Sequence, residues 1–399
     1  MADLSTTPPL TRESVIEAHK LIGSYVHFTP VLTNQTITKL ASTPRTAEEL
    51  EGTRYAGRTP ARPVLRLWFK CENLQRIGAF KARGAFHAIE RLKKEPGWLE
   101  GGGKEKGVVT HSSGNHAQAL ALAARESGIK AHIVMPEISN PKKIAGTKGY
   151  GARVIFSGST STEREAMAAK VIAETGARLV PPYDHPDILL GQGTLGLEFQ
   201  QQVSELMTAD VVVDGQRRLF RAPVTGRDNE APRTKKEKPG LDAIMTPCGG
   251  GGMLSGVALS CTGIRVFGSE PSFEGADDAK RGFESGTRIT TVKTLTVADG
   301  LRTPVGEHPW SVIYGRRLVS GMYSVTEEEI LAAMKLVFER FKLVVEPSAC
   351  VPLAVALFDE DFRSMVEREA GEEGWDLGLV FSGGNIGLDA VGKLFEGNK

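Results

Sequence analysis

The sequence of 399 residues lacks long hydrophobic runs, an excess of either charge and any signal-peptide-like start. No stretch approaches the ~20 apolar residues of a membrane span, and residues 1–9 are polar. Lysine plus arginine number 49 against 48 aspartates plus glutamates, so no overall field attracts nucleic acid or an anionic membrane. We therefore expect a cytoplasmic protein that binds neither nucleic acid nor membrane.

Cysteine is also scarce. The four cysteines are scattered and form no Cys-x-x-Cys pair, so the spacing predicts neither a disulfide framework nor a zinc knuckle. With 40% hydrophobic and 24% charged residues, the chain is an ordinary globular protein. Its length suits one large domain or two packed lobes.

What the sequence does contain is a lysine in unusual surroundings. Lys81 follows Gly78, Ala79 and Phe80, between an apolar strand-like run at 64–71 and a predicted helix at 85–94. A lysine held in an apolar site has its charge disfavoured, so it can act as an amine nucleophile or base. A lone lysine is usually a surface residue. The neighbouring motifs favour the functional interpretation here.

From residue 107 onward, short apolar runs alternate with helical stretches. Strands alternating with helices predict parallel sheets with right-handed crossovers, and therefore an α/β fold. A first helix is predicted near 14–22, with Ser14 and Glu17 spaced as a capping box. The other expected strands are 108–110, 131–135, 154–156, 178–180, 241–246, 264–268 and 377–381, and the other expected helices are 116–127, 141–150, 162–174, 194–206, 326–341 and 351–357.

A run of four glycines, Gly249, Gly250, Gly251 and Gly252, precedes Met253 between a predicted strand and a helix. Residues without Cβ allow several backbone N–H groups to converge on one anion, at the positive end of the helix. The spacing does not match Gly-x-Gly-x-x-Gly, and no Gly-Lys-Ser/Thr follows, which excludes dinucleotide and Walker loops. A flexible turn is the alternative to a phosphate site.

Two more loops of small polar residues follow predicted strands. Ser112, Ser113, Gly114, Asn115 and His116 open a helix, where free N–H groups and hydroxyls suit a carboxylate. The alternative is that Ser113 or Asn115 only caps the helix. The second loop, Ser-Gly-Gly-Asn at 382–385, comes directly after the last predicted strand.

Together these motifs resemble the serine/threonine dehydratase and serine racemase family of pyridoxal-phosphate (PLP) enzymes. The stretch at 70–85, Lys-x-Glu-Asn-Leu-Gln-x-x-Gly-Ala-Phe-Lys-x-Arg-Gly-Ala, is similar to the family's cofactor-lysine signature, with Ala79 where Ser is usual. The resemblance implies a two-lobed α/β fold of the tryptophan-synthase-β type (PLP fold type II). It also implies a small lobe at 107–183 and a large PLP-binding lobe at 1–106 and 184–399.

The resemblance assigns roles to residues as follows. PLP would be covalently bound to Lys81, the catalytic lysine, with Phe80 beside it. Asn115 would contact the phenolic oxygen, Ser382 would face the pyridine nitrogen and Glu346 would lie beside the ring. The glycine run and Met253 would hold the phosphate. Substrate would be bound by Ser112, Ser113, Asn115, His116 and Arg164, and Ser113 would be the acid/base on the opposite face in a racemase.

A cation site is also implied. The segment from Glu270 to Asp278 is similar to a Glu-Pro-x-x-Ala-x-Asp site of the racemases, with two extra residues between Glu270 and Ala276. Two carboxylates and the Ala276 carbonyl would suit Mg²⁺ or Ca²⁺.

Two segments read as surface insertions, at 42–63 and 214–240. The first is rich in Thr, Pro, Arg and Gly and lacks apolar periodicity. The second contains eight arginines and lysines, which is typical of a solvated loop or of a docking patch for an acidic partner.

The activity implied by the resemblance is β-elimination from a hydroxy amino acid, L-serine, L-threonine or threo-3-hydroxyaspartate, giving a keto acid and ammonia. Serine racemisation by the same site is a further expectation, and so is a homodimer. A hydroxyl at Ser382, unlike a carboxylate, does not force the pyridine nitrogen to stay protonated, which favours elimination over transamination. The alternatives are a β-replacement enzyme and a non-catalytic PLP or amino-acid binding protein.

Overall fold

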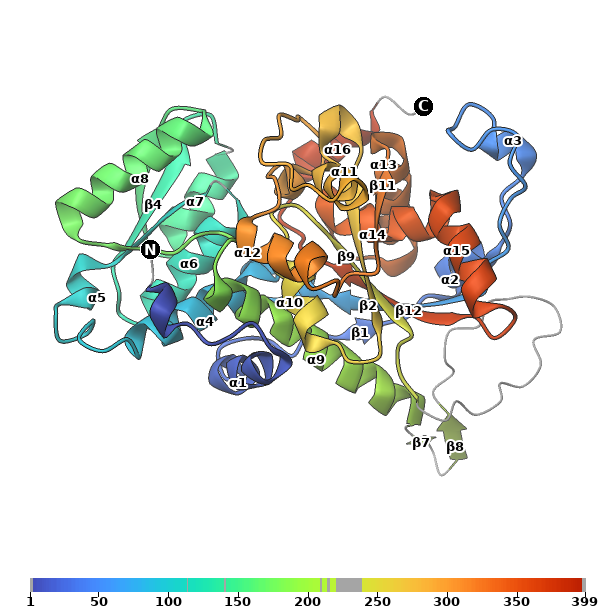
Figure 1. Ribbon diagram of the computed structural model, residues 1–399, viewed down its shortest axis with the longest axis horizontal. Coiled ribbons are helices and arrows are strands. Elements are labelled where there is room, and N and C mark those ends of the chain that lie inside the picture. The colour runs from blue at the N-terminus through green and yellow to red at the C-terminus, as the bar shows by residue number, and fades with distance from the viewer. Residues whose placement is uncertain are drawn as a thin grey trace.

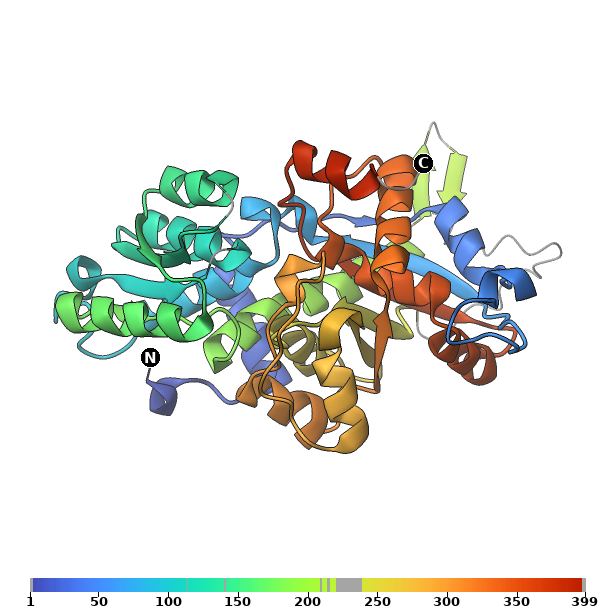
Figure 2. The same cartoon turned by 90° about the horizontal axis from the view of Figure 1, so that it is seen from above.

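The computed structural model describes residues 3–112, 114–139, 141–208, 210–213, 216–219 and 239–396. The two larger β-sheets lie side by side, and helices cover both faces of each (Figure 1). The view from above shows the two layered units next to each other along the long axis of the molecule (Figure 2).

The larger sheet has six strands in the order β1-β2-β12-β9-β10-β11. All neighbouring strands are parallel except β1, which is antiparallel to β2. Sheets buried on both faces need nearly continuous apolar runs, and every residue of β2, β9 and β12 is buried. The strands are β1 (Val31–Leu32), β2 (Leu65–Cys71), β9 (Ala243–Pro247), β10 (Arg265–Pro271), β11 (Gly321–Val325) and β12 (Trp375–Phe381).

The two faces of this sheet carry separate cores. Along β9, Ala243 and Met245 join one hydrophobic cluster, while Ile244 between them joins the other. This alternation follows from the two-residue repeat of a strand. One face is covered by α2 (Gln35–Ser42), α13 (Glu327–Leu336), α14 (Pro347–Phe358) and α15 (Glu360–Ala370), and the other by α1 (Arg12–Ile22), α9 (Pro186–Thr208) and α10 (Gly252–Ser260).

The smaller sheet has four parallel strands in the order β5-β4-β3-β6. They are β3 (Val108–His111), β4 (Ala131–Pro136), β5 (Arg153–Ser157) and β6 (Arg178–Leu179), with α6 (Asn115–Glu126) and α7 (Pro141–Gly149) on one face and α8 (Ser161–Thr175) on the other. Helix α4 (Lys81–Lys93) packs against both α6 and α9, so it joins the two sheets.

The remaining elements are short. They are α3 (Ala47–Leu50), α5 (Gly103–Lys106), α11 (Asp278–Ser285), α12 (Glu307–Trp310), α16 (Leu388–Phe395), the hairpin β7 (Asp210–Val213) and β8 (Gln216–Leu219), and the turns η1 (Leu4–Thr6), η2 (Glu72–Leu74), η3 (Arg76–Gly78), η4 (Phe273–Gly275), η5 (Asp299–Leu301), η6 (Ser311–Gly315) and η7 (Val337–Phe341). Among the described residues, no helix has the length and apolar character needed to cross a membrane.

Several predicted helix boundaries were wrong. Helix α1 starts at Arg12, because the Thr11 side chain accepts from the Ser14 N–H, so the expected Ser14 cap lies inside the first turn. Helix α9 starts at Pro186 rather than near residue 194. In its first turns, a Cβ at Gly191 would lie 2.7 Å from the Gly84 Cα. These glycines allow α9 to approach α4 closely, which periodicity alone does not show.

The first predicted insertion, 42–63, has structure of its own. It contains α3, and Tyr55 is buried. Two arginines of the segment pair with the start of α15, Arg54 with Asp359 and Arg58 with Asp361, both at 2.7 Å. Of the second insertion, the described residues are those of β8 and residues 239–240, and the remainder lies outside the part of the chain that the structure describes.

Candidate active site

Lys81 is the first residue of α4, at the carboxyl end of the larger sheet. Strand β2 ends at Cys71, and two short 3-10 turns, η2 and η3, lead to Lys81. The segment before the lysine is tied to the end of β12, because the Phe80 N–H donates to the Ser382 carbonyl at 3.0 Å. The helix was predicted to begin four residues later. Its earlier start places Lys81 on a fixed helical turn.

The Lys81 amine lies in surroundings of low polarity. Its Nζ donates to the Pro182 carbonyl at 2.6 Å and lies 5.2 Å from the centre of the Phe80 ring. Burial lowers the pKa of Lys81 to about 8. A substantial fraction of the amine is therefore neutral near physiological pH, and the neutral amine is the form that attacks a carbonyl or accepts a proton.

The glycine run opens α10 at the carboxyl end of β9. Within the described part of the chain, none of the N–H groups from Gly249 to Met253 donates a hydrogen bond. Free N–H groups at the start of a helix form an anion site. Gly251 has a φ of 82°, and a Cβ at Gly250 would lie 2.4 Å from the Tyr183 ring. The geometry therefore requires glycine here, as a phosphate cradle does.

A segment that the sequence motifs did not indicate connects these two features. Pro182 accepts the hydrogen bond from Lys81, and the ring of Tyr183 covers Gly250. The Asp184 carboxylate accepts from the Glu307 and His308 N–H groups, both at 2.9 Å, at the start of α12. Residues 182–184 carry no local signal of this role, since it arises only from their position between two loops.

The amide of Asn115 connects the two sheets. Its Nδ2 donates to Glu346 Oε1 at 2.9 Å, and its Oδ1 accepts from Asn385 Nδ2 at 2.8 Å. Burial, followed by the nearby Asp299, raises the pKa of Glu346 to about 7. Ser382 directly follows β12 and is buried, and the Glu346 N–H donates to the carbonyl of the next residue, Gly383, at 3.0 Å. The structure thus brings Asn115, Glu346 and Ser382 to one place, from three distant parts of the chain.

The other predicted substrate residues come from the smaller sheet. Ser112 follows β3, and the Gly114 N–H faces its hydroxyl at 3.4 Å. His116 is buried, with Nε2 3.2 Å from the Val180 carbonyl, and burial lowers its pKa to about 3. It is therefore neutral across the physiological range. Arg164 lies on α8, within electrostatic reach of Tyr183. Ser113 lies outside the described residues.

Comparison with known proteins identifies this arrangement. A family model described as pyridoxal-phosphate dependent enzyme matches residues 53–220 and 229–371. The chain belongs to this family. It is 37% identical to a serine racemase of Arabidopsis thaliana, over 97% of this chain and 96% of that protein. It is 34% identical to an L-threo-3-hydroxyaspartate ammonia-lyase of Saccharomyces cerevisiae, over 98% and 97%.

A solved structure of maize serine racemase matches with a TM-score of 0.75 and 35% identity, over 96% of both chains. These likenesses confirm the predicted α/β fold class of PLP fold type II and the predicted family. The residues present also fit the cofactor. PLP carries an aldehyde, a phosphate and a ring nitrogen, and the site offers the Lys81 amine, the free N–H groups of the glycine run and the buried Ser382.

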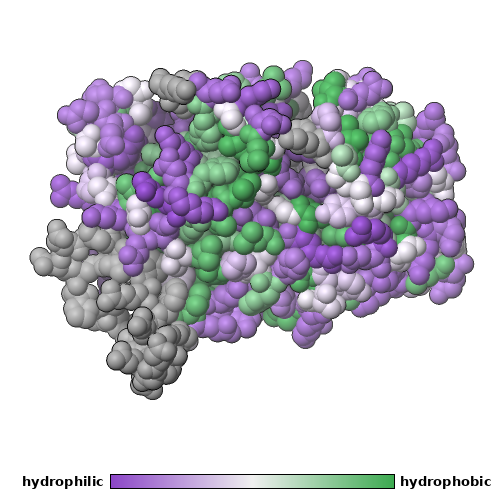
Figure 3. Space-filling view, turned by 180° about the vertical axis from the view of Figure 1, so that it is seen from behind, coloured by the Kyte–Doolittle hydropathy of each residue, from purple (hydrophilic) through white to green (hydrophobic). Residues whose placement is uncertain are grey.

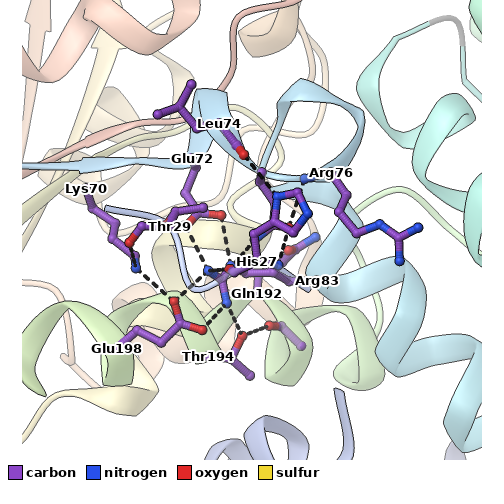
Figure 4. A network of polar contacts seen from close by, with 12 residues as sticks. His27, Thr29, Lys70, Glu72, Leu74, Arg76, Arg83, Gln192, Thr194 and Glu198 are labelled. Carbon is purple, nitrogen blue, oxygen red and sulfur yellow. Dashed lines mark hydrogen bonds and ion pairs between the residues drawn. The ribbon is translucent and has the colours of Figure 1, made fainter. Parts of the chain in front are cut away.

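Three residues of the cofactor-lysine signature have a role that sequence reasoning missed. Lys70, Glu72 and Arg83 join Glu198 of α9 in a buried network of four charges (Figure 4). Arg83 contacts Glu72 at 2.8 Å and Glu198 at 2.7 Å, and Lys70 contacts Glu198 at 2.8 Å. The two carboxylates outweigh the cost of burial and raise the pKa of Arg83. This network holds the first turns of α4, and therefore Lys81, onto α9.

The predicted cation residues are close together but have protein partners. Glu270 is buried and accepts from the Ala279 and Lys280 N–H groups, at 3.1 and 2.8 Å. Asp278 Oδ2 accepts from the Val305 N–H at 3.1 Å, while its buried Oδ1 has no hydrogen-bond partner among the described residues. Burial raises the pKa of Asp278 to about 7. The described residues contain no group of three or more His, Cys, Asp or Glu side chains suited to a metal.

Proposed function

We propose that this chain catalyses the PLP-dependent β-elimination of a small hydroxy amino acid, L-serine, L-threonine or threo-3-hydroxyaspartate, to a keto acid and ammonia. The observation that carries the proposal is the Lys81 amine of lowered pKa, at a helix start, in one site with the free N–H groups of the glycine run. For serine, the net change is one serine to one pyruvate and one ammonia, so atoms balance without an oxidant.

PLP, when bound, supplies an electron sink that acidifies the α-proton of an amino acid joined to it. The chain's own groups do the rest. Lys81 accepts and returns a proton, since its pKa near 8 permits both states. The glycine run binds the phosphate, and Ser382 offers the ring nitrogen a neutral hydroxyl. The N–H groups at the start of α6 and Ser112 bind the substrate carboxylate, and Arg164 faces the substrate side chain.

Serine racemisation is the second candidate, favoured by the likeness to the racemases. It requires an acid/base on the face opposite Lys81, the role proposed for Ser113. An amino-acid panel tests both activities, with keto acid measured alongside chiral analysis of the remaining amino acid. Keto acid from L-serine, L-threonine or threo-3-hydroxyaspartate supports elimination. Formation of a β-substituted product when a thiol is added would show that the enzyme catalyses β-replacement instead of elimination. If the PLP-loaded protein turns over none of the amino acids, a non-catalytic binding protein is favoured.

We also propose that the chain is divided into two lobes. The small lobe, at 107–183, contains the four-stranded sheet, and the large lobe comprises 1–106 and 184–399. Lys143 of α7 and Asp299 of η5 form an ion pair between the two lobes at 2.5 Å.

A site for Mg²⁺ or Ca²⁺ at Glu270, Ala276 and Asp278 is also proposed. The Asp278 Oδ1 has no hydrogen-bond partner among the described residues, and the raised pKa values of Glu270 and Asp278 show that their negative charges are poorly compensated, which a cation would correct. Cytoplasmic location stays a prediction.

A homodimer is proposed because apolar residues are exposed together on one part of the surface. The space-filling view from behind shows apolar residues in a stripe down one face (Figure 3). Phe28, Leu74 and Val344 are exposed hydrophobic residues on adjacent segments, since His27 contacts the Leu74 carbonyl and Asn73 donates to the Val344 carbonyl. Apolar residues gathered in this way favour protein contact. Sedimentation of wild type and of Leu74→Glu tests this: a dimer that becomes monomeric supports the proposal, and a monomeric wild type overturns it.

A further inference from the structure

Three side chains form a continuous line of hydrogen bonds beside the Lys81 turn. Asn385 Nδ2 donates to the Ile77 carbonyl at 2.7 Å and to Asn115 Oδ1 at 2.8 Å. Asn115 Nδ2 in turn donates to Glu346 Oε1 at 2.9 Å. The line joins the turn before Lys81, the segment after β12, the start of α6 and the residue before α14.

The direction of every hydrogen bond in this line follows from its first member. A backbone carbonyl can only accept, so Asn385 must present its NH₂ group to Ile77. The same NH₂ group faces Asn115, which must therefore present its oxygen. The nitrogen of the Asn115 amide is then directed toward the Glu346 carboxyl. An Asn side chain can otherwise bind with either end, and here one end is selected.

The backbone at the first member is unusual. Ile77 has a φ of 59°, in the left-handed region that β-branched residues rarely adopt, and Gly78 follows with a φ of 69°. A Cβ at Gly78 would lie 3.0 Å from Asn385 Oδ1. The two residues therefore form a tight left-handed turn packed directly against Asn385, two residues before the Phe80–Lys81 pair. Local strain of this kind is concentrated at functional sites.

We propose that Asn385 is a positioning residue that, with the Ile77 carbonyl and Glu346, fixes the orientation of the Asn115 amide toward the cofactor. This rests on the proposed function, in which Asn115 contacts the phenolic oxygen of PLP. One N–H of Asn115 is used by Glu346, and the other remains to donate to that oxygen. With the amide reversed, an oxygen would face the phenolate, and the two would repel.

The surroundings of Glu346 support this arrangement. Burial, followed by Asp299 of η5, raises the pKa of Glu346, while Lys143 of α7, Asn115 and the Asn385 backbone N–H favour its ionised form; in either form the carboxyl keeps an oxygen that can accept from Asn115. An acceptor oxygen at this position keeps the Asn115 nitrogen turned toward it. Asn385 and Glu346 therefore hold the two ends of one amide.

The first test is Asn385→Ala in the PLP-loaded enzyme, with Asn73→Ala as matched control. Asn73 is buried, whereas Asn385 is half-buried, but its Nδ2 likewise donates to a backbone carbonyl, that of Val344 at 3.1 Å, and it has no hydrogen bond to Asn115. We expect the apparent pKa of the Lys81–PLP absorption band to rise by about one pH unit in Asn385→Ala, because a donor to a charged oxygen is lost. The control should leave this pKa unchanged. Equal behaviour of the two variants overturns the proposal.

A double-mutant cycle then shows whether Asn385 acts through Asn115. If it does, Asn115→Ala produces the same shift, and adding Asn385→Ala produces no further shift. Additive shifts would mean that Asn385 acts independently and would overturn the positioning role. If Asn385→Ala does not fold, Asn385→Ser is used instead. The serine hydroxyl keeps a polar group at this position but is too short to reach both the Ile77 carbonyl and Asn115 Oδ1.

A measurement on the cofactor-free protein separates this inference from the proposed function. With ¹⁵N-labelled asparagine, the Asn115 side-chain N–H that donates to Glu346 should exchange slowly with solvent in wild type and rapidly in Asn385→Ala. Rapid exchange in wild type overturns the positioning role. A wild-type protein that forms no absorbing adduct with PLP, yet shows the slowly exchanging Asn115 N–H, would refute the cofactor assignment and leave the hydrogen-bond line intact.

Discussion

Removing one carboxylate from the buried charge network should destabilise the protein far more than removing one from its surface. Glu198 contacts Lys70 at 2.8 Å, with side chains only 2% and 0% exposed. Glu17 contacts Lys20 at the same 2.8 Å, with side chains 71% and 67% exposed. The pairs share residue types and distance and differ in burial. Glu198→Gln and Glu17→Gln therefore isolate the effect of burial on an ion pair.

The expected magnitude follows from the contacts of Glu198. Its carboxylate accepts from Arg83 Nη1 at 2.7 Å, Arg83 Nη2 at 2.8 Å and Lys70 Nζ at 2.8 Å. Glutamine removes the charge and places an NH₂ donor against these donors, so one buried cation loses its counter-charge. Breaking a buried pair in this way costs about 3–5 kcal/mol. The exposed pair contributes about 0–1 kcal/mol.

Urea unfolding of the PLP-free variants at pH 7, followed by circular dichroism, measures both effects. With a slope of about 3 kcal/mol per M, the midpoint should fall by about 1–1.7 M for Glu198→Gln and by less than about 0.3 M for Glu17→Gln. Lys70→Met combined with Glu198→Gln should recover much of the loss, because it removes the unpaired cation and leaves the Arg83–Glu72 pair. Equal midpoints for the two single variants would refute the reasoning.

The network also predicts a pH dependence. Burial opposes ionisation of Glu198, but Arg83 and Lys70 outweigh it, so the pKa of Glu198 is lowered. A lowered carboxyl pKa contributes stability that is present above the unfolded pKa and is lost as the pH falls through the folded value. The difference in unfolding free energy between wild type and Glu198→Gln should therefore be largest at pH 7. It should become smaller in acid, below about pH 4.5.

Three further predictions concern the site. Acetylation of Lys81 in the PLP-free protein, read by peptide mapping, should rise with pH around a midpoint near 8 because burial lowers its pKa, and a midpoint above 10 would contradict this. Gly250→Ala should weaken PLP binding at least tenfold, since the added Cβ would lie 2.4 Å from the Tyr183 ring. Gly392→Ala is the control: its added Cβ would have no atom within 4 Å, so this variant should bind PLP normally in the same titration. Mg²⁺ or Ca²⁺ should raise the unfolding temperature of wild type but not of Asp278→Asn, and an equal rise in both would place the cation elsewhere.

The sequence by itself determined the fold class, the family and the candidate site motifs. Local order carries this information. An apolar run precedes Lys81 and another precedes the four glycines, so both groups are expected in the connections that follow strands. In parallel sheets with right-handed crossovers, the carboxyl ends of the strands share one edge. Their proximity could therefore be expected from the sequence.

Only the tertiary structure decided what each motif residue contacts. Lys70 and Arg83 read as parts of a cofactor signature, yet their charges are matched by Glu198, more than a hundred residues away. Tyr183 and Asn385 carry no local mark of their contacts with Gly250 and Asn115. The spacing of residues along one segment predicts which face of a helix or strand a side chain lies on. Burial, pKa and hydrogen-bond direction depend on groups from other segments, which folding alone brings together.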